Sequence, residues 1–411
     1  MHLLQSYPLS LHNPSRLLII LTLSISTILP DFAMHHLTNK LLTTLGLGTS
    51  ASPIPTPRQF HVAAQEHFIH PVHGTYPRLC RLSDGSLLAG FTAFGPDNQR
   101  ILSITRSTDQ GRTFHPHGEV TRSFGDCDNL FLLPLPDGTV LAAFRNHDLD
   151  LATGKAAYFR ITVCRSVDGG RTWEFLSQAA EKPAPFGLWE PFMRVEDSHR
   201  QDHDPGGSGG KDPEIQLLFS QERAADDQDT MLMSSVDGGK SWSGPGVAVT
   251  GAGERLRDGM VGVAETWDLK RRGERTLVMV LETTRKGVFS VEAVVSYDGG
   301  RTFGSRQVVY EAKGGKNAGA PQIASFRDGS VAVVFMTDED VSGESRWPRG
   351  AKVKAVFSGP PEDGRFWWTQ PQVVGEASSS WPGIIRVEDD AVLAVYEFSS
   401  SIRGRMLKLS V

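Results

Sequence analysis

The sequence has few cysteines, no surplus of basic residues and no apolar run long enough to span a bilayer. Its three cysteines, Cys80, Cys127 and Cys164, exclude a disulfide-rich scaffold and permit one bridge at most. No pair of them has metal-ligand spacing, so we expect buried thiols. The 42 Lys and Arg against 47 Asp and Glu give a net charge of −5, which argues against a nucleic-acid partner or an anionic membrane surface. The sequence also lacks an Asn-x-Ser/Thr acceptor site for N-linked glycans.

The most apolar segment, residues 17–29, is too short for a transmembrane helix, which needs about 20 residues. Arg16 precedes it, and Pro30 and Ala33 follow, as in a signal peptide ahead of a small-residue cleavage site. We therefore expect residues 1–33 to be a signal peptide, with a signal anchor as the alternative, and residues 34–59 to be a linker. The remaining domain, residues 60–411, is then expected to be secreted, extracellular and without a membrane partner.

One octapeptide recurs four times along the chain. It reads STDQGRTF from Ser107, SVDGGRTW from Ser166, SVDGGKSW from Ser235 and SYDGGRTF from Ser296. Asp favours a tight turn by accepting bonds from backbone N–H groups, and Gly does so by adopting positive φ. The closing aromatic residue is suited to plug the core beneath the turn. The pattern predicts hairpin turns, and it gives structural rather than catalytic roles to Asp109, Asp168, Asp237 and Asp298.

A second repeat alternates with the first. Six segments lead from a short strand through a turn to an alternating strand, with anchors at Pro77, Asn129, Pro191, Gly262, Pro321 and Pro382. Such segments are typical of β-hairpins, and no helical periodicity of comparable length competes with them. The six repeats predict an all-β fold, a six-bladed β-propeller with four-stranded blades and octapeptide turns. Residues 197–213, polar and rich in Gly, are expected to form a surface loop inserted in one blade.

The innermost strands of a propeller converge on one end of its channel, so reactive side chains are expected in the second repeat, which supplies those strands. Glu190 in GLWEPFMR and Glu265 in RDGMVGVAET stand out, on matching strands of neighbouring blades. Two carboxylates about 5–5.5 Å apart suit retaining glycoside hydrolysis. Burial beside Trp189 or Met260 would raise a carboxyl pKa enough for proton donation near neutrality. The spacing alone also allows each glutamate to be an ordinary solvated or ion-paired residue.

Further polar and aromatic residues of these segments are candidates for substrate binding. They are Tyr76, Arg78, Asp128, Asn129, Trp189, Arg257, Asp258, Gln322 and Trp381, with His147 and Arg386 as additional members. Sugar sites combine aromatic faces with a few polar groups that hold hydroxyls. The competing interpretation is that Arg78 and Arg257 only brace loops by pairing with Asp258 or Asp128. No dedicated ligand cluster is evident, so neither a metal nor a cofactor is expected.

The octapeptides resemble the Asp-box repeats of the sialidase superfamily, which contains both enzymes and non-catalytic binding proteins. A more specific resemblance is to fungal exo-arabinanases of glycoside hydrolase family 93. It rests on TYPRLCRLSDGSLLAGF, GLWEPFMR, the SQE of LLFSQERAADDQ, RDGMVGVAE and AGAPQI. This resemblance implies a six-bladed propeller that releases arabinobiose from the non-reducing end of linear α-1,5-L-arabinan with retention. It places the catalytic glutamates at Glu190, as nucleophile, and Glu265, as acid/base.

Two other functions stay open. A sialidase-like enzyme would clamp a substrate carboxylate with three arginines, two of which could be Arg78 and Arg386, although TYPRL replaces the usual Phe-Arg-Ile-Pro start. A non-catalytic propeller that binds carbohydrate or protein is the other alternative. For the enzyme we expect a monomer whose partner is a polysaccharide or oligosaccharide.

Overall fold

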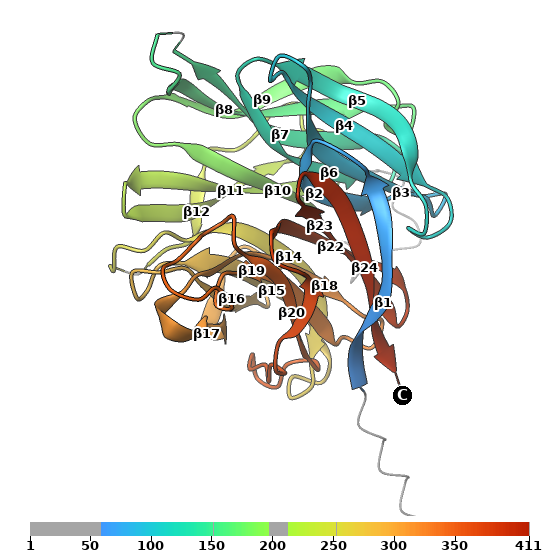
Figure 1. Ribbon diagram of the computed structural model, residues 1–411, viewed down its shortest axis with the longest axis vertical. Coiled ribbons are helices and arrows are strands. Elements are labelled where there is room, and N and C mark those ends of the chain that lie inside the picture. The colour runs from blue at the N-terminus through green and yellow to red at the C-terminus, as the bar shows by residue number, and fades with distance from the viewer. Residues whose placement is uncertain (1–58, 151, 197–212, 252, 411) are drawn as a thin grey trace, which may run out of the picture. The chain divides into compact units, whose positions relative to one another are not determined.

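The computed structural model describes residues 59–150, 152–196, 213–251 and 253–410, and the strands of this part form six four-stranded antiparallel sheets (Figure 1). The six-bladed β-propeller is thereby confirmed. The predicted signal peptide or anchor, the linker up to residue 58 and residues 197–212 of the predicted insertion lie outside the described residues. Within the described part, no helix is long and apolar enough to cross a membrane.

Each blade has one innermost strand, followed outward by three more. Blade 1 contains β2 (Gly74–Arg81), β3 (Leu87–Phe94), β4 (Arg100–Ser107) and β5 (His115–Ser123). Blade 2 contains β6 (Asp126–Pro134), β7 (Val140–Leu149), β8 (Ala156–Ser166) and β9 (Glu174–Pro183). Blade 3 contains β10 (Leu188–Glu196), β11 (Glu214–Ala224), β12 (Asp227–Ser235) and β13 (Gly246–Val249). Blade 4 contains β14 (Gly259–Asp268), β15 (Glu274–Thr283), β16 (Ser290–Ser296) and β17 (Gly304–Tyr310).

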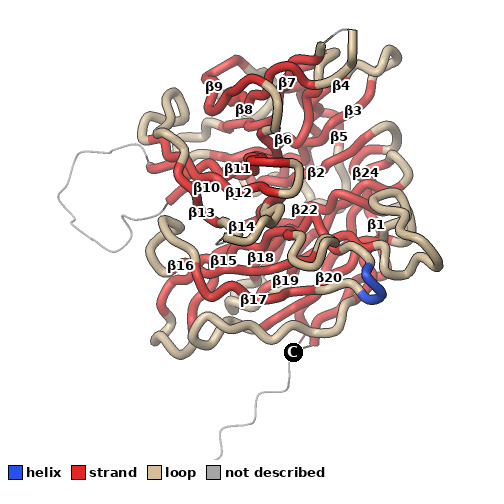
Figure 2. The backbone as a smooth tube through the Cα atoms, turned by 90° about the vertical axis from the view of Figure 1, so that its left-hand side faces the viewer, coloured by secondary structure: helices blue, strands red, loops and turns tan. Residues whose placement is uncertain are grey.

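The last two blades complete the ring. Blade 5 contains β18 (Ala318–Ser325), β19 (Val331–Thr337), β20 (Lys352–Ser358) and β21 (Gln372–Gly375). Blade 6 contains β22 (Ser379–Glu388), β23 (Ala391–Phe398), β24 (Ser401–Ser410) and, outermost, β1 (Gln59–His70). Because β1 pairs with β24, the two ends of the described chain share one sheet and hold the ring closed. Strands dominate the part of the trace that the structure describes, where the short 3-10 helix Lys313–Gly315 is the exception (Figure 2).

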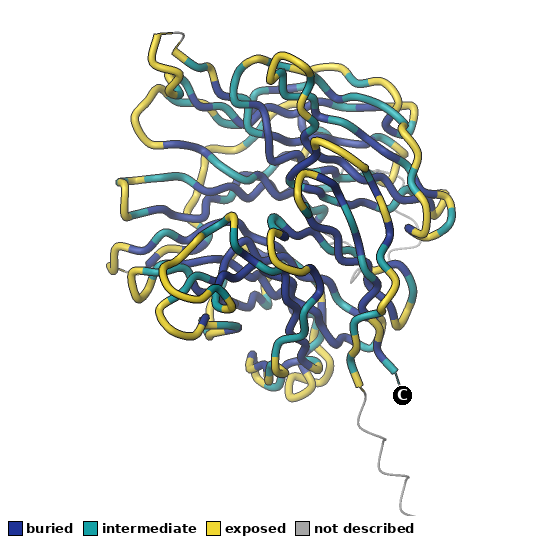
Figure 3. Tube along the Cα trace, in the orientation of Figure 1, coloured by how far each residue is buried: buried dark blue, intermediate teal, exposed yellow. Residues whose placement is uncertain are grey.

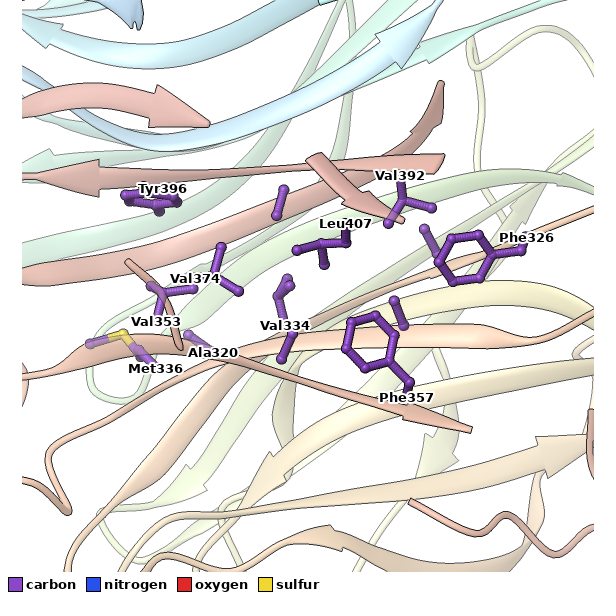
Figure 4. Close-up of a cluster of buried hydrophobic side chains, with 14 of the residues drawn as sticks. Ala320, Phe326, Val334, Met336, Val353, Phe357, Val374, Val392, Tyr396 and Leu407 are labelled. Atoms are coloured by element: carbon purple, nitrogen blue, oxygen red, sulfur yellow. The ribbon is translucent and has the colours of Figure 1, made fainter. Parts of the chain in front are cut away.

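The hydrophobic core lies between neighbouring blades. Middle strands have an apolar sheet on both sides and are therefore continuously buried, as in VAVVFMT of β19. Between blades 5 and 6, Phe326, Met336 and Phe357 pack in one cluster with Tyr396 and Leu407 (Figure 4). Exposure is concentrated in the connections between strands (Figure 3). Packing between neighbouring blades therefore adds to the β1–β24 pairing in holding the ring together.

The three cysteines are buried and unbridged, as expected from the sequence. They belong to one cluster of apolar residues from blades 1 and 2. Burial raises the pKa of the Cys80 and Cys127 thiols to about 12 and that of Cys164 to about 11. The thiols therefore stay protonated and serve as small apolar core residues.

The octapeptides form the hairpin turns between the third and fourth strands of blades 1 to 4. In the first of them, Asp109 Oδ1 accepts bonds from the backbone N–H groups of Arg112 at 3.0 Å and Thr113 at 2.9 Å. Ser107 Oγ accepts the N–H of Gly111 at 2.8 Å. Asp168, Asp237 and Asp298 repeat these contacts in the next three blades. The aspartates are therefore committed to the turn backbone at the end of the ring that we call the turn face.

Candidate functional site

Each innermost strand contains one extra residue relative to its partner strand. In blade 1, for example, Thr75 pairs with Thr92 but Arg78 pairs with Gly90, so three steps on β2 face two on β3. A β-bulge of this kind redirects a side chain and is common next to active sites. The same bulge occurs in all six blades, directly after the first, second or third residue of the innermost strand.

The first bulge residue of every blade has a left-handed backbone although none is glycine. The six residues, with φ between 45° and 56°, are Tyr76, Asn129, Glu190, Met260, Ala320 and Trp381. This conformation costs a non-glycine residue about 1 kcal/mol or more, so the surrounding sheets must impose it. We call the end of the channel lined by these six residues the funnel. It lies at the opposite end of the innermost strands from the turn face.

Glu190 lies in the funnel with part of its surface open and its carboxylate surrounded by protein. Desolvation raises its pKa, while the positive charges of Arg145 and Arg257 and a hydrogen bond from Ser220 oppose that shift. Ser220 Oγ accepts a hydrogen bond from the backbone N–H of Met260 at 3.3 Å, which leaves the hydroxyl proton to be donated to Glu190. Glu190 is thus a desolvated carboxylate with a raised pKa, a shift that Glu222 adds to and that the two arginines and Ser220 limit.

A second carboxylate in the funnel is Glu282, which sequence reasoning did not single out. It lies near the end of β15, opposite Gly259, and its Oε2 accepts the backbone N–H of Ala320 at 2.7 Å. Gly319 makes room for it, since a Cβ there would lie 2.5 Å from the same oxygen. Desolvation first, and then the negative charge of Glu190, raise the pKa of Glu282 to about 7. Glu282 can therefore hold a proton near neutrality.

The structure does not bring Glu265 to Glu190, and the expected pairing requires correction. Glu265 lies five residues beyond the bulge residue Met260, which corresponds to roughly 16 Å along a strand. It is half-exposed and pairs with Arg275, with Nη2 and Oε2 2.6 Å apart. Its strand neighbour Leu277 pairs with Ser296, the first residue of an octapeptide, so Glu265 belongs to the turn face. The sequence repeat identified the correct strand but not the position along it.

Asp128 and Asn129 belong to a buried ionic cluster on the blade 2 side of the funnel. Asp128, 3% exposed, accepts hydrogen bonds from Thr92 at 2.6 Å and Arg100 at 3.0 Å. Arg145 contacts Asp128 at 3.3 Å and Asn129 Oδ1 at 2.7 Å. Asp128 therefore braces the cluster, whereas Asn129 and Arg145 reach the funnel.

Arg78 and Gln322 close the floor of the funnel in equivalent ways. Arg78 donates to the carbonyl oxygens of Pro77 at 2.8 Å and Pro382 at 2.9 Å. Gln322 donates to those of Pro321 at 2.8 Å and Val261 at 3.0 Å. Each side chain thereby joins its own blade to the preceding one. Desolvation lowers the pKa of Arg78 to about 10, and the guanidinium remains charged at neutral pH.

Arg257 reaches the funnel, whereas its neighbour Asp258 does not. Arg257 contacts Glu222 at 2.9 Å and Gln228 at 3.1 Å. Asp258 is fully buried and holds Arg306 through both carboxylate oxygens at 2.7 and 2.9 Å. The expectation that Asp258 binds substrate is therefore corrected, because it supports the loop that carries Arg257. The alternative pairings of Arg78 or Arg257 with Asp258 or Asp128 are not seen either.

Aromatic side chains form one wall of the funnel. Tyr76 and Trp381 stack with ring centroids 4.4 Å apart and an interplanar angle of 19°. Trp189 instead points between blades 2 and 3, where it makes edge contacts with His147 and Phe159. Tyr76 and Trp381 are therefore placed to meet a ligand, while Trp189 supports the strand that carries Glu190.

The two additional candidates do not contact the funnel. His147 is buried, and its Nε2 lies 2.9 Å from the carbonyl oxygen of Leu188, which it holds in place. Arg386 is exposed five residues beyond Trp381, toward the turn face. Among the described residues, no group of three or more His, Cys, Asp or Glu side chains is arranged to hold a metal ion.

Three residues in or beside the funnel escaped sequence reasoning, Arg145, Glu282 and Trp347, and Glu222 entered it only as the last residue of the SQE motif, without a role. Glu282 ends the apolar run TLVMVLET, and an acid at the end of a buried strand is a usable signal. Trp347 belongs to the connection between β19 and β20, and its ring lies 3.3 Å from where a Cβ of Gly319 would be. Nothing in its local sequence indicates that position.

No protein-family model matches the sequence, and no curated protein does. Solved structures do match. An α-L-arabinanase from Penicillium chrysogenum, complexed with arabinobiose, is 18% identical with a TM-score of 0.59, over 85% of this chain and 98% of that one. The family 93 α-L-arabinofuranosidase of Fusarium graminearum, also with arabinobiose, is 19% identical with a TM-score of 0.58, over 84% and 98%. The sialidase NanB from Streptococcus pneumoniae is 12% identical with a TM-score of 0.53, over 88% and 71%. At these identities the likeness establishes the shared fold.

Proposed function

We propose that this protein is an exo-acting glycoside hydrolase that releases arabinobiose from linear α-1,5-L-arabinan with retention of configuration. The observation that carries the proposal is the pair of desolvated carboxylates, Glu190 and Glu282, that share the funnel in contrasting surroundings. Glycosidases need one carboxylic acid that is protonated and one that is ionised at the same pH. The similarity to arabinan-degrading propellers supports the choice of sugar.

In the proposed mechanism, Glu190 is the nucleophile. Arg145, Arg257 and Ser220 favour its ionised form, which attacks the anomeric carbon. Glu282 donates its proton to the leaving glycosidic oxygen. It then takes a proton from water, which hydrolyses the glycosyl–Glu190 ester and restores both carboxyl groups. Glu282 thus takes the acid/base role that the resemblance assigned to Glu265.

The charges of the funnel favour a neutral sugar over a sialoside. Three arginines lie near enough to Glu190 to interact with its charge: Arg78, Arg145 and Arg257. Three is the number that a clamp for the carboxylate of a sialoside would require. However, Arg145 already binds Asp126 and Asp128, and Arg257 already binds Glu222. Desolvation raises the pKa of Tyr76 well above its ordinary value, whereas a tyrosine nucleophile needs the opposite shift. A sialidase-like activity is therefore the less favoured candidate.

Product analysis tests the proposal. The purified protein is incubated with linear α-1,5-arabinan and, in parallel, with an aryl sialoside, and the released sugars are identified by chromatography and the anomer by early NMR spectra. We expect arabinobiose of retained configuration and no sialic acid. Sialic acid release would favour the sialidase-like alternative. Binding of arabinan without turnover would favour a non-catalytic carbohydrate-binding propeller.

A further inference from the structure

The orientation of the Asn129 side-chain amide is determined by its neighbour. Arg145 Nη1 lies 2.7 Å from Asn129 Oδ1, and a guanidinium group can only donate hydrogen bonds. The amide oxygen must therefore face Arg145, and the NH₂ group must point the other way. Arg145 is itself held by Asp126 at 3.0 Å and Asp128 at 3.3 Å, so this orientation is fixed.

The NH₂ group of Asn129 has no hydrogen-bond partner, although the residue is only 6% exposed. Buried donors are almost always satisfied, so an unpaired one points to a missing ligand atom or water. Asn129 lines a small cavity on the funnel floor together with Glu190, Arg78 and Gln322. The cavity volume of about 10 Å³ admits about one water-sized group, such as a hydroxyl oxygen.

We propose that this cavity is a hydroxyl subsite: Asn129 Nδ2 donates to one ring hydroxyl of the sugar that is cleaved, and that hydroxyl donates to Glu190. The inference rests on the proposed function and adds the group that the enzyme recognises beside its nucleophile. Only an atom that both accepts and donates satisfies the amide and the carboxylate together. A carboxylate in the same place would be repelled by Glu190, and an alkyl group would leave Asn129 unpaired.

The test is a cycle of enzyme and substrate changes with an aryl α-1,5-L-arabinobioside and its 2-deoxy and 3-deoxy forms, altered in the sugar that is cleaved. For the unchanged protein, one deoxygenation should lower kcat/KM by about 10- to 100-fold, as expected when a buried donor is left unpaired. In Asn129→Ala the same deoxygenation should change kcat/KM by less than about 3-fold, because its partner is gone. We call this dependence of the penalty on Asn129 the coupling. The hydroxyl whose removal is costly in the unchanged protein but not in Asn129→Ala is the one that enters the subsite.

Two variants separate recognition from structure. Asn129→Asp keeps the side-chain shape and the acceptor for Arg145 but removes the donor, so it should abolish the coupling in a folded protein. Asn146→Ala changes an asparagine that bonds Thr162 at 3.3 Å and does not line the cavity, and it should keep the full deoxygenation penalty. Equal penalties in the unchanged protein and both Asn129 variants would overturn the subsite while leaving the proposed function intact. No turnover of the parent glycoside by the unchanged protein would overturn both.

Discussion

Glu190 and Glu265 lie on innermost strands of neighbouring blades, yet they belong to opposite ends of the ring. Glu190 is a bulge residue with a φ of 45°, and its carboxylate is enclosed by the funnel. Glu265 lies in regular pairing with Leu277, half-exposed and bound to Arg275. Both are acids within apolar strands, so residue type does not distinguish them. The comparison shows that position relative to the bulge decides whether a side chain enters the funnel.

The largest effect is expected for Glu190→Gln. The change keeps the shape of the side chain and removes the negative charge that the mechanism requires, so hydrolysis of linear arabinan should fall by about 10³-fold or more. Steady-state kinetics of the purified variant checks this. The matched control is Glu265→Gln, which should keep kcat and KM within about 3-fold because the residue lies at the turn face. Equal losses in the two variants would contradict the distinction between the two ends.

Glu282→Gln should cost about 10²- to 10³-fold in kcat/KM on arabinan, since it removes the proton donor. The pH profile makes the test sharper. With a pKa of about 7, the acid form of Glu282 disappears as pH rises, so kcat/KM of the unchanged protein should decline above pH 7. That decline should be absent in Glu282→Gln. A profile that still falls above pH 7 in the variant would assign the proton donor to another residue.

Glu282 is expected to support activity but to lower the stability of the folded protein at neutral pH. The pKa of Glu282 is raised from 4.5 in the unfolded chain to about 7, so the folded state binds more protons between these values. The free energy of unfolding should therefore decrease as pH rises from 4.5 to 7, by up to about 3 kcal/mol. Glu282→Gln should unfold at a higher urea concentration than the unchanged protein at pH 7.5, and the two should converge near pH 4. Equal midpoints at both pH values would contradict a desolvated Glu282.

The fold was more predictable than the site because periodic features leave a repeating trace in the sequence. Four octapeptides and six hairpins were enough for the propeller and its turns. The bulges have no such trace, since Tyr76, Met260 and Ala320 occupy equivalent left-handed positions with unrelated side chains. Placement of the anchors at Pro77 and Gly262 was therefore off by one or two residues, and the same shortcoming allowed Glu265 to be grouped with Glu190.

Contacts between segments that lie far apart in the chain could not be predicted from the sequence either. Glu282 enters the funnel only because β15 pairs with β14 and because Gly319 leaves space beside it. Asp258 looked like a ligand residue beside Arg257, but Arg306 on β17 occupies both of its oxygens. These partners lie 38 and 48 residues apart in the chain and meet only through the pairing and packing of the sheets, so local pattern carries no information about them.

Trp381→Ala should have an intermediate effect on the funnel. It removes the ring that stacks on Tyr76 and a face for the sugar, so KM for arabinan should rise by about 10-fold with a smaller change in kcat. Trp367→Ala is the control, because Trp367 is 59% exposed and lies in the connection between β20 and β21. Similar losses in the two variants would contradict a binding role for the Tyr76–Trp381 wall.

The smallest effect on turnover is expected at the turn face, where Asp109→Ala should change stability and not chemistry. Although burial raises the pKa of Asp109, hydrogen bonds from Thr113, Ser107 and Arg112 lower it overall to about 2. Loss of these bonds should reduce the free energy of unfolding by about 1–3 kcal/mol at pH 7, measured by urea denaturation. Because the unfolded value is 3.8, the stabilisation is complete above about pH 5 and declines as pH falls toward 2, so the variant and the unchanged protein should converge there. Both should hydrolyse arabinan with the same kcat and KM below the unfolding transition; a changed kcat would show that the turn face communicates with the funnel.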